Sequence, residues 1–438
     1  AVSAPRFGLL TLVGLVVANM IGAGVFTTSG FALADLGTPD RVMLAWLTGG
    51  LLAVCGALSY GALVRRMTES GGEYLFLSRA IHPAAGFVAG WVSLLAGFTG
   101  AIALAATALE AYLLPAGTRP GWIPEDAVAL TVVFAAGALH VRKVGVGAGV
   151  QNALVIVKLI MIGAITVYAW SKLSTGAVPT GTSLAIGDGA VSDFEWSAFA
   201  VSLMWISLSY SGFNAAVYIA GEARDAKRQV PRALILGTAV VTVVYLALNA
   251  LFVYGAPSTA IAGHEDVAAR ALTALGGEPL GAAMRGIVIL ALATSVSSMI
   301  MAGPRVYARM ADDGVLPRMF ATRDGRVARA VTLQVVLAAL IIVVSDLREL
   351  LSYLGFTLSV SAALTVSSLF VLRRREGAVA VPVPGYPWVP GLYVGATLMF
   401  AAIAALHRPL EPVVGVATLA TGVVAWLIIE RRARFKAP

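Results

Sequence analysis

Long apolar stretches, each about the length of a membrane crossing, follow one another along almost the whole chain. A helix needs roughly 20 apolar residues to span the hydrocarbon core of a bilayer. Apolar residues make up 59% of the 438 residues and charged residues only 12%, which is too few charges to cover a soluble domain. The sequence therefore predicts an all-α polytopic membrane protein. Its twelve predicted transmembrane helices are 7–33, 42–64, 83–114, 126–140, 150–170, 194–220, 232–256, 281–304, 328–345, 350–372, 389–407 and 411–430.

The basic residues indicate how these crossings are oriented. Lysine and arginine are enriched in the loops that stay in the cytoplasm. Of the 31 Lys and Arg residues, 23 lie at the termini and in loops on the same side, 7 lie in the opposite loops, and Lys158 lies within a crossing. Both termini are thus predicted to be cytoplasmic, in a multi-pass protein of the cell (inner) membrane. This topology accounts for the net charge of +8 and leaves no basic face for nucleic acid.

Composition disfavours several other classes of protein. Cys55 is the only cysteine, so neither a disulfide within the chain nor a thiolate cluster for a metal is expected. The four histidines are widely separated, and His140, at the end of the fourth crossing, is expected to be solvated. An enzyme active site would gather acid–base or metal-binding residues in one pocket. The sequence shows no such group, so no enzyme activity, metal or cofactor is predicted.

Two of the predicted crossings contain interruptions. The first carries Gly22, Ala23 and Gly24 in its middle, and the sixth carries the polar run 207–214. Small residues in the first crossing could serve close helix packing. Alternatively, the helix breaks there, so that free amides face an anion and the preceding carbonyls face a cation. Breaks in crossings one and six occupy equivalent positions in two five-helix repeats, which is typical of inverted-repeat transporters.

Five short motifs, in the same order along the chain, resemble those of the amino acid, polyamine and organocation transporter family. The resemblance covers nearly the whole chain. It implies a five-plus-five inverted-repeat (LeuT-like) fold with discontinuous helices one and six. The first repeat would occupy 1–170, the second 191–372, and two further helices with the C-terminus 389–438. The motifs are 21–26 (IGAGVF), 71–74 with 86–91 (GGEY and GFVAGW), 221–233 (from GEAR to VPRA), 310–317 (MADDGVLP) and 383–390 (VPGYPWVP).

The resemblance also implies a substrate site built largely from backbone. The amides of Gly22, Ala23 and Gly24 would bind the carboxylate of an amino acid, and carbonyls before and around the two breaks would bind its amino group. Leu208 stands where relatives that bind cations carry an aromatic lid, so the site is expected to suit a neutral side chain. The remaining candidate site residues are Asn19, Met20, Ile21, Gly97, Ala101, Ser207, Ser209, Gly212 and Met299.

Lys158 is the only basic residue in the middle of a crossing. An ionisable group inside a membrane is costly and usually functional, although a lysine near a helix end can extend to the surface. In sodium-independent relatives, a lysine at this position takes the place of a sodium ion. The resemblance implies that its ammonium lies among carbonyls near Val17 and Met20 and the hydroxyls of Ser297 and Ser298. Either serine could instead bond one helix to another.

These features favour a secondary active transporter for neutral amino acids. It would work by alternating access, without sodium, as a proton symporter or an exchanger. Helices 1, 2, 6 and 7 would rock against helices 3, 4, 8 and 9. Two alternatives remain open: a transporter for cationic amino acids or polyamines, and an amino acid-gated channel or receptor. The expected partners are the small-molecule substrate and membrane lipid, with no nucleic acid, and the protein is expected as a monomer or homo-oligomer.

Overall fold

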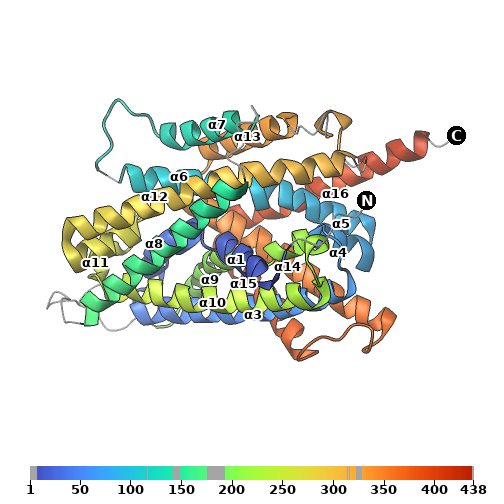
Figure 1. Cartoon of the computed structure of the whole chain (residues 1–438), viewed down its shortest axis with the longest axis horizontal. Coiled ribbons are helices and arrows are strands. Elements are labelled where there is room, and N and C mark those ends of the chain that lie inside the picture. Colours follow the sequence, from blue (N-terminus) through green and yellow to red (C-terminus); the bar gives the residue numbers. More distant parts are fainter. Residues whose placement is uncertain are drawn as a thin grey trace.

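The computed structural model describes residues 7–115, 117–141, 148–174, 193–312, 314, 316–321 and 328–436. The predicted motif at 310–317 and the chain ends at 1–6 and 437–438 therefore fall partly or wholly outside the described residues. Every element longer than a single bridge in the described part is a helix. The helices pack around one another as a bundle (Figure 1). The all-helical prediction is confirmed.

The helices follow the predicted crossings in order. Three short elements lie in the connections: α4 (Gly72–Ala80), α11 (Ser258–Ile261) and η3 (Arg318–Phe320). The others are α1 (Leu9–Met20), α2 (Ala23–Leu36), α3 (Pro39–Arg66), α5 (Pro83–Val92), η1 (Ser93–Gly100), α6 (Ala101–Leu113), α7 (Ala127–Val141), α8 (Ala148–Ser174), α9 (Trp196–Tyr210), η2 (Ala215–Glu222), α10 (Ala226–Tyr254), α12 (Val267–Asp312), α13 (Ala328–Val344), α14 (Leu347–Glu376), α15 (Trp388–His407) and α16 (Leu410–Lys436).

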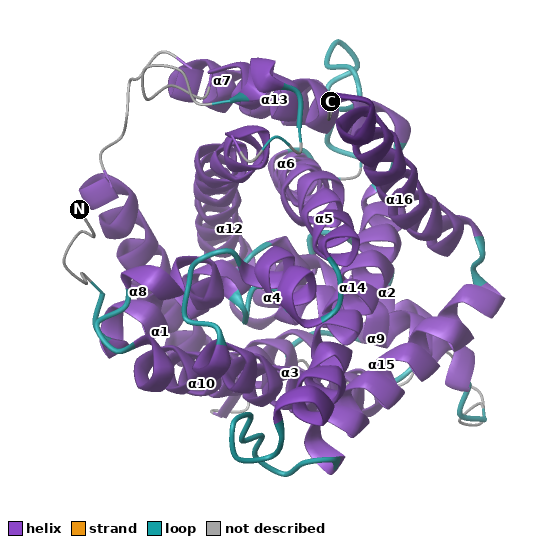
Figure 2. Ribbon diagram, turned by 90° about the vertical axis from the view of Figure 1, so that its right-hand side faces the viewer, coloured by secondary structure: helices purple, strands orange, loops and turns teal. Residues whose placement is uncertain are grey.

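Helix length and composition support a multi-pass membrane protein. Within the described ranges, eight helices are long and apolar enough to cross a membrane, or nine if the bent pair α1 and α2 forms one span. Two further apolar helices, α7 and α13, are shorter and lie side by side at one edge of the bundle (Figures 1 and 2). The count of twelve crossings and the five-plus-five repeat stay predictions.

The predicted interruption of the first crossing is a helix break. Helices α1 and α2 meet at an angle of 42°, because Ile21 leaves the helical region with φ −76° and ψ 89°. The two halves differ in their surroundings. Nearly all of α2 is buried, whereas in α1 only Leu12, Val16 and Met20 are buried. The break is therefore enclosed on the α2 side and more exposed on the α1 side.

The interruption of the sixth crossing starts later than predicted. Helix α9 continues regularly to Tyr210, so the break begins at Ser211 and not at Ser207. The serines before it fit within the helix, since the hydroxyl of Ser209 lies 3.3 Å from the carbonyl of Trp205 one turn earlier. Gly212 then turns the chain at φ +93° before the 3-10 helix η2.

The two breaks lie against each other. A Cβ atom added to Gly212 would come within 3.0 Å of the Asn19 carbonyl oxygen at the end of α1. At the other end of α1, the amide of Phe7 donates to the carbonyl of Glu222 at 3.2 Å, and the amide of Arg224 donates to Phe7 at 3.0 Å. Helix α1 and η2 are thus joined at both ends and form one unit.

The α2 half is sealed by the connection between α10 and α12. The amide of Gly263 donates to the carbonyl of Gly30 at 2.8 Å. A Cβ atom on Gly30 would collide with the His264 carbonyl oxygen, and it would come within 3.1 Å of the carbonyl carbon. Only glycine at this position permits the backbones to approach so closely.

We expect Gly30→Ala to lower the free energy of unfolding by about 1–3 kcal/mol, because the added methyl group overpacks this contact. Gly163→Ala is the matched control, since a Cβ atom there meets nothing within 4 Å. Thermal unfolding of the purified protein in detergent measures both changes. Equal stability of the two variants would contradict the close contact.

Candidate functional site

The N-terminus of α2 presents free backbone amides to an open space at the first break. Gly22 is the N-cap residue, and no side chain caps this helix end. A Cβ atom on Gly22 would find only the Met20 carbonyl oxygen, at 4.0 Å. A helix N-terminus favours an anion because its amides are unpaired and its dipole is positive there. A carboxylate site at the amides of Gly22, Ala23 and Gly24 stays a prediction, and the missing cap at this helix end is compatible with it.

Gly24 has a second reason to be glycine. A Cβ atom on it would lie 2.9 Å from both Cα and Cβ of Ser209, so α2 and α9 touch closely at this point. The hydroxyls of Thr28 and Ser209 lie 3.3 Å apart beside this contact. Both interpretations of the small-residue run therefore hold, at different residues: the helix breaks at Gly22, and Gly24 permits close packing.

Tyr245 of α10 joins the two breaks. Its hydroxyl lies within hydrogen-bonding distance of the Met20 carbonyl at the end of α1, and 3.0 Å from the Ser209 carbonyl at the end of α9. The side chain is fully buried. Tyr245 is not among the residues predicted from the sequence, although a tyrosine in the middle of an apolar crossing is itself a signal, because a buried hydroxyl needs a partner.

A buried aromatic cluster holds Tyr245 in position. The rings of Trp46 and Tyr210 lie 5.4 Å and 5.1 Å from its ring, centroid to centroid. The indole of Trp46 donates to the hydroxyl of Ser29 at 2.8 Å, and Ser29 donates to Asn249 at 2.6 Å. Helices α2, α3, α9 and α10 are therefore linked around the breaks by satisfied buried polar groups.

Lys158 of α8 also reaches the first break. Its ammonium donates to the carbonyl of Ile21 at 3.1 Å, and the residue is 2% exposed. The Val17 carbonyl, named among the expected partners, accepts from the Ile21 amide at 3.2 Å. Two carbonyl oxygens lose their helical partners at the break. The Met20 carbonyl accepts a hydrogen bond from Tyr245, and the Ile21 carbonyl accepts one from Lys158.

The two serines of α12 have other hydrogen-bond partners in this structure. The hydroxyl of Ser297 lies 3.0 Å from Nε2 of His140, and Ser298 donates to the Thr294 carbonyl at 2.8 Å. The expectation that His140 is solvated is wrong, because its ring reaches from α7 to α12. A role for Ser297 and Ser298 beside Lys158 stays a prediction.

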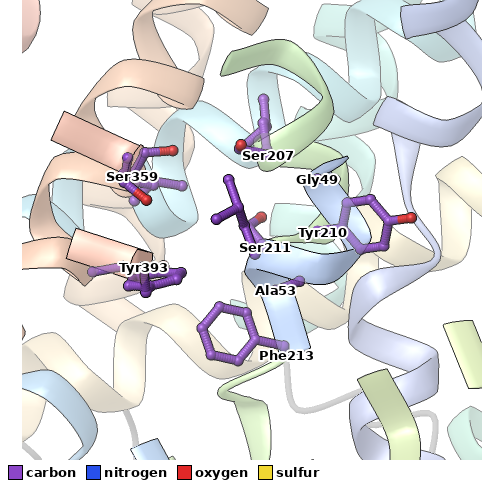
Figure 3. Close-up of a pocket in the computed structure, with 13 residues that line it drawn as sticks. Gly49, Ala53, Ser207, Tyr210, Ser211, Phe213, Ser359 and Tyr393 are labelled. Carbon is purple, nitrogen blue, oxygen red and sulfur yellow. The ribbon is translucent and has the colours of Figure 1, made fainter. Parts of the chain in front are cut away.

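A cavity of about 50 Å³ lies behind the second break, between α3, α9, α14 and α15. Ser207 and Ser211 face Ser359 and Tyr393 across it (Figure 3). Leu208 also lines this cavity, whereas Ser209 points to α2, because successive side chains on a helix point in different directions. Leu208 therefore lines the cavity together with residues of α3 and α14. The candidates from the third and eighth predicted crossings, Gly97, Ala101 and Met299, do not line it.

The other candidates lie in separate places. Asn19 is exposed, and its side-chain amide donates to the Leu15 carbonyl of its own helix at 3.0 Å. Gly97 lies in η1, where a Cβ atom would be in ordinary contact with Leu358 of α14. Ala101 of α6 and Met299 of α12 are half-buried. The structure brings together residues 20–24, Ser209 and Gly212, while a shared pocket with the remaining candidates stays a prediction.

Comparisons with known proteins show which family the chain belongs to. The sequence pattern of the amino acid permease family matches residues 7–428. The large neutral amino acids transporter small subunit 2 of Homo sapiens is 25% identical over 439 residues, covering 97% of this chain and 80% of that protein. The serine/threonine exchanger SteT of Bacillus subtilis is 26% identical over 405 residues, covering 90% and 89%. The human b(0,+)-type amino acid transporter 1 is 25% identical over 393 residues, covering 86% and 78%.

The fold is that of a multi-pass helical membrane protein with a broken first helix. The chain belongs to the amino acid permease family, whose members are transporters and not enzymes. The family resemblance drawn from the motifs is thereby confirmed.

We expect Tyr245→Phe to lower the free energy of unfolding by about 1–3 kcal/mol, since it leaves buried carbonyls of Met20 and Ser209 without this donor. Tyr254→Phe is the control in the same helix, because its hydroxyl bonds Asp40 at the surface. Thermal unfolding in detergent compares the two. A loss no larger than that of Tyr254→Phe would show that Tyr245 does not hold the breaks together.

Proposed function

We propose that the protein is a secondary active transporter of neutral amino acids, that it works by alternating access, and that it needs no sodium. The observation that carries the proposal is the free space beside the uncapped amides of the first break, with hydrogen-bonded carbonyls next to it. An amino acid carries a carboxylate and an ammonium group. The break offers backbone donors to the first and carbonyl oxygens to the second, since a carbonyl oxygen can accept two hydrogen bonds.

The placement of buried acids supports a neutral substrate. In the described residues, the buried carboxylates are Glu73, Glu110 and Asp266. Glu110 pairs with Arg119 and Asp266 with Arg270, each at 2.6 Å. Glu73 accepts hydrogen bonds from side chains outside the first break, and none of the three lines the cavity of Figure 3. A cationic side chain would be left without a counter-charge, which is costly inside a protein.

Lys158 supports sodium independence. Its ammonium already supplies a positive charge at the Ile21 carbonyl, where a sodium ion would need oxygen ligands. Proton symport and exchange both remain compatible with this arrangement.

The contrast between the two halves of the broken helix supports alternating access. Helix α2 is closed off at Gly30 by the chain after α10, while α1 is the more exposed half. During transport, a carrier would open the enclosed half and enclose the exposed half, with the breaks as hinges. A channel or receptor could keep the same binding site, so saturable uptake with acceleration by internal substrate is the observation that separates a carrier from either. Monomer or homo-oligomer also stays a prediction.

We expect Gly22→Val to abolish binding of neutral amino acids, because its side chain would occupy the space beside the α2 amides. The backbone at Gly22, with φ −131°, accepts any residue, so this variant should fold. A ligand at ~100 times its dissociation constant stabilises a protein by about 2.7 kcal/mol, and a thermal-shift screen measures this gain. Gly14→Val is the control, because a Cβ atom there meets nothing within 4 Å. Gly24→Val is unsuitable because it collides with Ser209. Unchanged binding by folded Gly22→Val would refute the proposed carboxylate site.

We expect uptake into proteoliposomes to be independent of sodium and to fall at least tenfold in Lys158→Ala, about 1.4 kcal/mol or more in transition-state terms. Removing the ammonium leaves the Ile21 carbonyl unpaired inside the bundle. Lys172→Ala is the matched control, since Lys172 lies near the end of the same helix and is exposed. Sodium stimulation of the native protein, or full activity of Lys158→Ala, would contradict the assigned role.

A further inference from the structure

A buried carboxylate lies away from the substrate site, where four elements meet. Glu73 lies in the first turn of α4 and is 7% exposed. It accepts hydrogen bonds from the hydroxyl of Tyr60 in α3 at 2.5 Å and from the side-chain amide of Asn214 in the second break at 3.1 Å. The hydroxyl of Ser361 in α14 donates to its other oxygen at 3.1 Å. Three donors on three separate segments thus converge on one carboxyl group.

No cation compensates this carboxyl group. In the described residues, Glu73 forms no ion pair with lysine, arginine or histidine. The titratable groups that face it are three neutral phenols: Tyr60 of α3, Tyr218 of η2 and Tyr393 of α15. Arg375 of α14 contacts α4 only at the Ala80 carbonyl, at the other end of that helix. Burial raises the pKa of Glu73, while its three hydrogen bonds oppose that rise.

The two glycines before Glu73 shape this junction. Gly72 has φ +58°, and a Cβ atom on it would lie 2.9 Å from Cζ of the Tyr218 ring. The amide of Gly221 also donates to the hydroxyl of Ser70 at 3.1 Å. The start of α4 is therefore docked on η2, which is joined to the start of α1 through Phe7. The second break, which supplies Asn214 to Glu73, is thus linked to both α1 and α4.

We propose that Glu73 is a proton-binding site that latches α3 and the second break to α4 and α14 when ionised, and that it takes up a proton when these elements separate. An ionised carboxylate accepts hydrogen bonds and donates none, so it uses all three donors in the closed junction. Separation removes Tyr60 and Asn214 and leaves the buried charge with Ser361 of α14 as the one remaining donor of the three. Protonation by water entering the opened junction removes that cost. The proposal rests on the proposed function for its role in transport, but its proton binding can be measured without a substrate.

The first test is the pH dependence of thermal stability of the full chain in detergent, between about pH 4 and 8. A folded-state pKa above the unfolded value gives stability that is complete below the unfolded pKa and is lost as pH rises through the folded pKa. We expect this loss in the native protein and a smaller loss in Glu73→Gln, which mimics the protonated form and removes the share that belongs to Glu73. Glu69→Gln is the control, because Glu69 forms a surface pair with Arg79. Glu69→Gln should lose thermal stability with rising pH as the native protein does.

Tyr60→Phe provides a second variant if Glu73→Gln does not fold. It removes one donor to the ionised form, so the midpoint of the pH-dependent loss should move upward by about one pH unit. An unchanged midpoint, or an identical pH dependence in the native protein and Glu73→Gln, would overturn the assignment of Glu73 as the proton-binding site. These readouts hold even if none of the tested amino acids is transported.

The latch itself is tested by cysteine accessibility. Ala216 of η2 is fully buried, and Cys55→Ser removes the native thiol. In that background, a maleimide should modify Ala216→Cys several-fold faster when Glu73→Gln is added, at one fixed pH. Adding Glu69→Gln should leave the rate unchanged. Equal rates with and without Glu73→Gln would overturn the latch.

Discussion

The backbone groups set free at the first helix break govern the rest of this structure. Inside a membrane, each unpaired carbonyl or amide must find a partner in the protein, because no water is available to supply one. Tyr245 donates to Met20, and Lys158 donates to Ile21, from helices on different sides of the break. The amides of α2 remain as the unpaired set. The proposed substrate site, with donors for an anion beside carbonyl oxygens, is based on this arrangement.

The tyrosine and the lysine explain why the broken helix can exist within a tightly packed bundle. Tyr245 also reaches the Ser209 carbonyl, so one hydroxyl group joins both breaks. Its ring is fixed by Trp46 and Tyr210, and this cluster links four helices. Gly24 and Gly212 then let the segments approach closely without side-chain collisions. The hydrogen bonds to the freed carbonyls and the close backbone contacts therefore occur at the same place. The helix breaks are stabilised by the packing of the surrounding helices.

Several features could be predicted from the sequence because they depend on local composition. Apolar runs predicted helices, and the glycines at 22 and 24 predicted an interruption in the first crossing. The second break was placed four residues early, since serine hydroxyls can bond within their own helix and do not by themselves interrupt it. The sequence did not reveal which face of α9 carries Leu208. Its side chain lines the cavity between α3, α9, α14 and α15, and its contact with a substrate stays a prediction. A rotation of about 100° per residue decides such a face, and periodicity is weak in a helix that is apolar all round.

The sequence by itself determined that this chain is a multi-pass helical protein of the amino acid permease family, because length, apolarity and short motifs are properties of the linear chain. Only the tertiary structure decided which groups meet. Tyr245 and Met20 are separated by 225 positions, and Ser361 and Glu73 by 288, so no local pattern could pair them. Hydrogen-bond partners inside a membrane protein are set by which helix faces pack together. That packing is a property of the whole bundle and not of any one segment.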